Sequence, residues 1–136
     1  MNAHLESLIE HMRWANARTL ENLRDTPVAE AVRLFAHVLT TECLYHARIT
    51  GQDPWPQDFW PDLSLEQCAA LLPQNYERYV AFLNARPEQA LERNVRYRNS
   101  KGTVFHTAVG EMLTHLALHG EHHRGQIARI VRRAGG

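Results

Sequence analysis

The chain has 136 residues, with 15 basic and 15 acidic side chains that balance to a formal net charge of zero. This balance gives no electrostatic reason to expect nucleic acid or an anionic membrane surface as a partner. The length is typical of one domain with its own hydrophobic core, so we expect residues 1–136 to form a single domain.

The pattern of apolar residues and the spacing of the cysteines predict the cellular compartment of the protein. No apolar run approaches the length of a membrane span, and residues 1–25 mix charged with apolar side chains, unlike a signal peptide. Cys43 and Cys68 are isolated and form no C-x-x-C pair, which is typical of a protein in a reducing compartment. We therefore expect a cytoplasmic protein. The nine histidines are the unusual feature of the composition.

Two amphipathic helices are predicted in the first 50 residues. The first, over residues 2–24, is interrupted on its apolar face by Asn16 and Thr19, which we expect to point inward. Pro27 ends it, because the residue before a proline is biased away from the helical conformation. The second helix spans residues 28–50 and stops at Gly51. The apolar faces comprise Leu5, Leu8, Ile9, Met12, Leu20 and Leu23, and then Ala31, Leu34, Phe35, Val38, Tyr45 and Ile49.

Residues 52–61 interrupt the helical pattern with three prolines and three large aromatic side chains. Proline lacks the N–H that a helix or a central strand requires, so this stretch is predicted to be a structured loop or lid. We expect Trp55, Phe59 and Trp60 to cover another part of the molecule.

A third helix is predicted to begin at a capping box of the S-x-x-Q form, Ser64-Leu-Glu-Gln67. Its apolar pattern continues to about Ala85. Pro73 lies inside this pattern and would cost about 3 kcal/mol if the strain were not relieved. The pattern does not decide whether Pro73 kinks the helix or splits it.

A short hairpin and a long final helix complete the chain. Apolar residues from Leu91 to Phe105 flank a turn at Asn99-Ser-Lys-Gly102, which is a weak signal for two short strands. Residues 106–133 then read as one long amphipathic helix. The fold class predicted from these elements is all-α: a four-helix bundle with long connections and a short β-hairpin before the last helix.

Four histidines lie close together in the predicted final helix. His119 and His123 have the i, i+4 spacing that places two imidazoles side by side, within reach of one metal ion, whereas His115 and His122 point away. The alternative is that His123 is a hydrogen-bonded core histidine and the others are solvated. A metal site also needs a ligand from another helix. The candidates are His37, His46, His4 and His11, and periodicity alone does not choose among them.

Four motifs, in order along the chain, resemble those of the DinB/YfiT-like family. They are Met12-Arg-Trp14-Ala-Asn16, Leu34-Phe-Ala-His37 followed by Tyr45, Arg48 and Gly51, Tyr97-Arg-Asn99-Ser-Lys-Gly102, and the H-x-x-x-H-R-G-Q motif from His119 to Gln126. The last motif is specific, and the others reinforce it. Tyr45 stands where this family commonly has a tryptophan, which is a conservative departure.

The resemblance implies a four-helix bundle that holds a divalent metal ion on three histidines and often forms homodimers. By that resemblance the ligands are His37, His119 and His123. Imidazole ligands suit zinc, nickel, iron and copper, and ligand type alone does not separate these metals. Zinc and nickel are the first expectations, and iron is the next. Three neutral imidazoles leave the ion its full charge and an open coordination position, which is typical of catalytic sites.

Residues around the motif also have expected roles. We expect Gln126, Asn16 and Thr41 to accept hydrogen bonds from the imidazoles. Gly120 and Gly125 each cost roughly 1 kcal/mol in a helix interior relative to alanine, which predicts close approach of a neighbouring helix or a dimer partner. Arg124 is expected to pair with an acidic side chain on a neighbouring helix.

Two functions are compatible with such a site. The first is a metal-dependent enzyme, a thiol-dependent transferase or a hydrolase, with a low-molecular-weight thiol or another small molecule as substrate. No catalytic side chain beyond the metal ligands can be identified. The second is a non-catalytic metal-binding protein of the stress response. Arginines near the end of the last helix complement its dipole, so they give little support to nucleic-acid binding.

Overall fold

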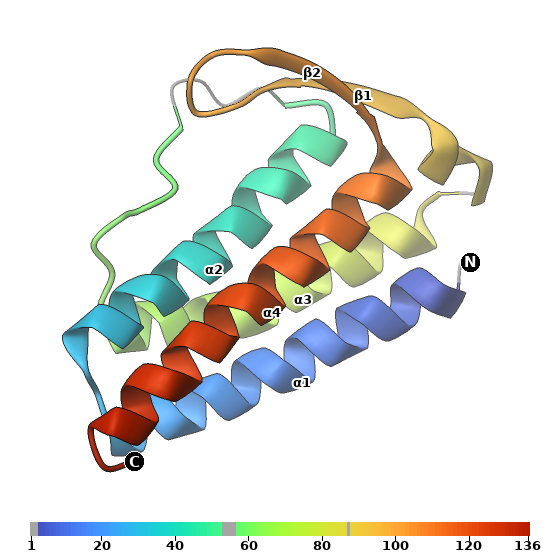
Figure 1. Cartoon of the computed structure of the whole chain (residues 1–136). Coiled ribbons are helices and arrows are strands. Elements are labelled where there is room, and N and C mark those ends of the chain that lie inside the picture. Colours follow the sequence, from blue (N-terminus) through green and yellow to red (C-terminus); the bar gives the residue numbers. More distant parts are fainter. Residues whose placement is uncertain (1–2, 53–56, 87) are drawn as a thin grey trace.

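The computed structural model describes residues 3–52, 57–86 and 88–136. The chain folds as four long helices with a short antiparallel hairpin before the last one, which confirms the predicted fold class (Figure 1). The elements are α1 (Ala3–Asp25), α2 (Ala29–Ile49), α3 (Leu65–Asn84), the 3-10 helix η1 (Glu88–Glu92), β1 (Asn94–Arg98), β2 (Val104–Ala108) and α4 (Val109–Arg133). None of the described helices is long and apolar enough to cross a membrane.

The hydrogen bonds between helices give their relative directions. His11 of α1 contacts Glu121 of α4, and further along Asn16 contacts Arg124, so α1 and α4 run in the same direction. α2 runs against α4, because His37 meets His119 whereas Tyr45, two turns later, lies against His115. In Figure 1 the hairpin lies across one end of the bundle, above the end of α2 and the beginning of α4.

The predicted helix ends agree with the structure to within one residue, except for the start of the last helix, which differs by three residues. The last helix begins at Val109 and not at residue 106, because His106 belongs to β2, where it pairs with Arg96 of β1. Leu91, expected at the start of the hairpin region, lies instead in η1, from which its side chain enters the core.

α3 confirms the predicted capping box. The Ser64 side chain accepts a hydrogen bond from the Gln67 backbone N–H at 3.1 Å, and the Gln67 side chain accepts one from the Ser64 N–H at 2.8 Å. The helix continues through Pro73 without interruption, so the proline does not split it.

The turn between β1 and β2 lies at the predicted position. The Asn99 side chain accepts hydrogen bonds from the backbone N–H groups of Lys101 and Thr103, each at 2.9 Å. Gly102 adopts a φ of 84°, a left-handed conformation that glycine reaches without a steric penalty.

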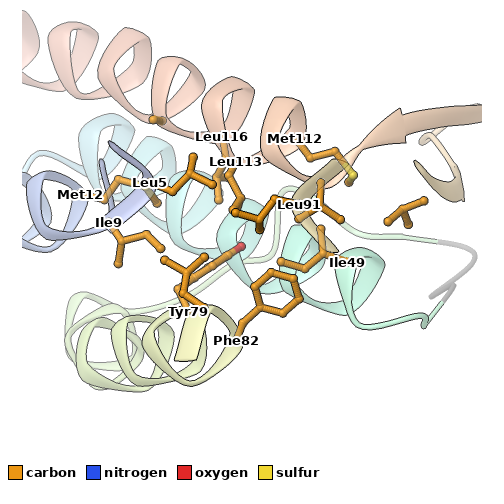
Figure 2. Close-up of a cluster of buried hydrophobic side chains, with 14 residues drawn as sticks. Leu5, Ile9, Met12, Ile49, Tyr79, Phe82, Leu91, Met112, Leu113 and Leu116 are labelled. Carbon is orange, nitrogen blue, oxygen red and sulfur yellow. The ribbon is translucent and has the colours of Figure 1, made fainter. Parts of the chain in front are cut away.

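Two clusters of buried apolar side chains form the core, one toward each end of the bundle. The cluster near the hairpin brings Tyr79 and Phe82 of α3 together with Leu5 and Ile9 of α1 (Figure 2). Full burial of each such side chain contributes about 1.5–3 kcal/mol to stability. The core therefore fixes how α2 and α4 face each other, and this arrangement positions the histidines.

Candidate metal centre

Three histidines from two helices converge inside the bundle. His37 extends from α2, and His119 and His123 extend from successive turns of α4. Each residue offers a ring nitrogen, and these atoms all lie within 4.8 Å of one another. The Nε2 atoms of His37 and His119 are 3.0 Å apart. The structure thus brings together the three residues that the resemblance implies.

Two contacts with residues 57–60 hold the ring of His37. Its Nδ1 donates a hydrogen bond to the Phe59 carbonyl oxygen at 2.6 Å. A carbonyl oxygen only accepts, so the proton is on Nδ1 and the Nε2 lone pair of the neutral ring is directed toward His119. The Trp60 ring stacks on the imidazole of His37, with the two centroids 3.8 Å apart and the planes 1° apart.

Phe59 and Trp60 therefore cover His37, which confirms the expectation that the aromatic residues of this loop cover another part of the molecule. Trp55, named in the same expectation, lies outside the described residues.

A side chain of α4 orients His123. The Gln126 side-chain oxygen accepts a hydrogen bond from His123 Nδ1 at 2.7 Å, as predicted, and this leaves Nε2 of His123 free to bind an ion. His119 Nδ1 is buried and forms no hydrogen bond within the part of the chain that the structure describes.

The expected roles of Thr41 and Asn16 were wrong. Thr41 Oγ1 donates to the backbone carbonyl of His37, one turn earlier in the same helix, and does not contact the ring. Asn16 is buried, as predicted, but it bonds to Glu42 and Arg124 and not to an imidazole.

Burial and mutual proximity lower the pKa of two of the three rings, those of His37 and His119. Burial, followed by the nearby His123 and His37, lowers the pKa of His119 from its ordinary 6.5 to about 4. Burial also lowers the pKa of His37, although the hydrogen bond to Phe59 opposes the shift. The neutral imidazole is the form that binds metal ions, so His119 and His37 are ready for a metal ion near neutral pH.

The other candidate ligands lie elsewhere. His46 packs edge-on against the Tyr79 ring on the far side of α2. His11 binds Glu121 at the surface, and His4 is exposed. Among the described residues, the convergent group consists of His37, His119 and His123.

A buried polar network ties α4 to the other three helices beside this site. Arg124 is 7% exposed, and its Nη1 donates to Asn16 Oδ1 at 2.7 Å. Asn16 and Asn75 each donate to one carboxylate oxygen of Glu42, at 2.9 and 3.1 Å. Burial raises the pKa of Glu42, and these hydrogen bonds together with the charge of Arg124 oppose the shift. Because Arg124 follows His123 directly, this network also fixes the turn of α4 that carries the ligands.

The ion pair of Arg124 differs from the prediction. Its acidic partner is Glu121 of the same helix, with Nη2 to Oε1 at 2.8 Å, and its contact with a neighbouring helix is the hydrogen bond to Asn16. Gly120 is likewise explained within α4. A Cβ there would lie 2.9 Å from Nη1 and 3.1 Å from Nη2 of Arg124, so the guanidinium and not another helix occupies the space. At Gly125 no neighbouring helix approaches within the described part of the chain, since nothing lies within 4 Å of a Cβ there, and close approach of a dimer partner stays a prediction.

An open cleft of about 430 Å³ borders His37 and His119. Trp60 and Phe59 line one part of it, and the hairpin turn at Asn99 and Ser100 lines another. This volume is within the range of small-molecule sites. Gln57 and Asp58 also line it, and the sequence did not single them out, because the loop, the hairpin and α2 meet only in the folded chain.

Comparisons with known proteins identify what the chain is similar to. The model of the DinB family matches residues 1–136. The chain is also similar to Protein DinB of Bacillus subtilis (strain 168), with 32% identity over 71 residues, which is 52% of this chain and 40% of that relative. The alignment thus spans less than half the length of the curated relative.

Proposed function

This chain belongs to the DinB family, and from that membership and the converging imidazoles we propose that it binds one divalent transition-metal ion through His37, His119 and His123. The observation that carries the proposal is the gathering of three ring nitrogens within 4.8 Å. The hydrogen bonds from Nδ1 of His37 and His123 support it, because they leave both Nε2 atoms available as metal ligands. Zinc and nickel are the first candidates for the ion, and iron is the next.

We further propose that the site is catalytic and acts on a small molecule in the adjoining cleft. Three protein ligands leave a coordination position open, which is the arrangement of catalytic and not of structural zinc sites. A divalent ion held there supplies Lewis acidity, which lowers the pKa of a water molecule or a thiol that reaches the open position. The cleft beside His37 and His119 supports access of such a molecule.

The chain's own residues contribute binding and orientation. His37 and His123 present Nε2 because their Nδ1 protons are held by the Phe59 carbonyl and by Gln126. Trp60 covers one face of His37 and excludes water from it. The reaction class proposed is a thiol-dependent transfer or a hydrolysis. A low-molecular-weight thiol, a homodimeric assembly and a cytoplasmic location belong to the same proposal, the last supported by the unpaired Cys43 and Cys68.

The test compares turnover and metal dependence in protein purified without a histidine tag. Zinc- and nickel-loaded protein is assayed for conjugation of low-molecular-weight thiols to electrophiles and for ester hydrolysis. Chelator-treated protein and His119→Ala serve as inactive controls, and His122→Ala, which changes an exposed neighbour of the site, serves as the matched active control. Metal-dependent turnover that His119→Ala abolishes is expected. Stoichiometric metal binding with no turnover in either the thiol-conjugation or the ester-hydrolysis assay would favour the non-catalytic role.

A further inference from the structure

Arg48 is a buried cation at the end of α2, far from the three histidines along the helix. It is 3% exposed and lies eleven residues after His37, which at 1.5 Å per residue is about 16 Å along the axis. Burial of a guanidinium is costly unless its hydrogen bonds are satisfied by the surrounding structure. The partners of Arg48 therefore indicate its structural role.

Besides the ring of Tyr45 in its own helix, Arg48 contacts residues of the loop and of the hairpin. Arg48 Nη2 donates to the Gln57 side-chain oxygen at 2.7 Å and to the Arg98 carbonyl at 3.2 Å. Gln57 in turn donates to the same carbonyl at 3.2 Å. The guanidinium also lies 5.3 Å from the ring centroid of Phe59 and 4.5 Å from that of Tyr97. Arg48 thus fastens residues 57–59 to α2 and to the end of β1.

The same short segment holds His37. Phe59, whose ring faces Arg48, provides the carbonyl oxygen that accepts from His37 Nδ1 at 2.6 Å. Trp60, the next residue, stacks on the imidazole. Arg48 therefore contacts Gln57 and Phe59, and Phe59 and the residue after it contact His37.

We propose that Arg48 is a positioning residue for His37, acting through residues 57–60. The guanidinium keeps the Phe59 carbonyl and the Trp60 ring in place, and these two groups fix the tautomer and the orientation of the imidazole. This inference rests on the proposed metal site. Contacts that orient a metal-binding histidine typically change metal affinity by 10- to 100-fold when they are lost.

The test measures cobalt(II) affinity and the absorption spectrum of the cobalt form for Arg48→Met. We expect a 10- to 100-fold weaker cobalt Kd and altered ligand-field bands, with partial recovery in Arg48→Lys. The matched control is Arg93→Met, because Arg93 also bonds to the end of α2, at the Ile49 carbonyl, and forms no hydrogen bond with the described residues 57–60. Gln57→Ala removes one partner of Arg48 and should also weaken cobalt binding. This milder variant provides the test if Arg48→Met does not fold.

A double-mutant cycle and a metal-free readout separate positioning from general stability. Trp60→Leu should weaken cobalt binding in the wild type but add little in the Arg48→Met background, since both act through one segment. In the metal-free protein, ¹⁵N shifts of His37 should show the Nδ1–H tautomer in the wild type and a mixture in Arg48→Met. A lower melting temperature with unchanged cobalt Kd, spectrum and tautomer would overturn the inference. Failure of the wild type to bind cobalt would instead contradict the proposed function.

Discussion

Gly120 lies where an alanine would ordinarily stabilise a helix, yet we predict that Gly120→Ala destabilises this protein. In an open helix interior the substitution would contribute up to about 1 kcal/mol of stability, because glycine is the poorer helix former. Here the new Cβ would lie 2.9 Å from Arg124 Nη1, closer than real contacts allow, so the guanidinium must move.

The cost of that movement decides the sign. Arg124 is buried, and its hydrogen bonds reach Asn16 Oδ1 at 2.7 Å and Glu121 Oε1 at 2.8 Å. Hydrogen bonds that involve a charged group contribute about 1.5–3 kcal/mol, and the bond to Asn16 is the buried one. Weakening it outweighs the gain in helix propensity. We therefore expect a net loss of roughly 0.5–2 kcal/mol for Gly120→Ala.

The chain provides a matched control in the same helix. At Gly125 nothing lies within 4 Å of a Cβ, so Gly125→Ala should stabilise by up to about 1 kcal/mol. Urea denaturation in the presence of chelator gives the free energy of unfolding without a contribution from bound metal. In an Arg124→Met background, Gly120→Ala should become neutral or stabilising. If Gly120→Ala stabilises the wild type as much as Gly125→Ala does, the packing argument fails.

Two further predictions concern the histidines. The pKa of histidine is 6.5 in the unfolded chain, whereas burial lowers the pKa of His119 to about 4 in the folded protein. Between these two pH values the unfolded state therefore binds more protons than the folded state. The metal-free protein should therefore keep the stability that comes with a neutral His119 above pH 6.5, and lose it as the pH falls toward 4. The melting temperature of His119→Gln should depend less on pH over this range. Gln126→Ala removes the acceptor of His123 Nδ1 and should weaken zinc binding about 10- to 100-fold in a competition titration, whereas Arg129→Ala, an exposed change in the same helix, should not.

Local sequence patterns predicted the helices because their apolar residues repeat with the helical period and their ends carry recognisable signals. The Ser64 capping box and the turn at Asn99–Gly102 are examples in which a few neighbouring residues determine the local structure. The pair His119 and His123 could likewise be predicted, since their spacing within one helix places the rings side by side.

The remaining ligand could not be derived from periodicity. His37 and His46 both lie at edges of the apolar face of α2, and the choice between them depends on which edge faces α4. The resemblance implied His37, and the structure places the centroid of its ring 4.8 Å from the ring centroid of His119, whereas His46 packs on Tyr79.

Buried charges were the main omission. Glu42 and Arg48 would ordinarily be assigned to a solvated face, because charged residues are seldom buried without partners. The side chains and carbonyl that hydrogen-bond to them come from α1, α3, the loop and the hairpin, so no local sequence pattern predicts that Glu42 and Arg48 are buried. Gly120 was open to prediction, since it stands four residues before Arg124, whose side chain points back along the helix toward it.

The central claim is that three imidazoles hold one divalent ion. X-ray absorption at the metal edge of zinc-loaded protein, purified without a histidine tag, tests it most directly. We expect one ion per chain with three imidazole nitrogens at about 2.0–2.1 Å, falling to two in His37→Ala. A spectrum in which His37→Ala leaves the imidazole count unchanged, or a protein that retains no stoichiometric metal, would contradict the account.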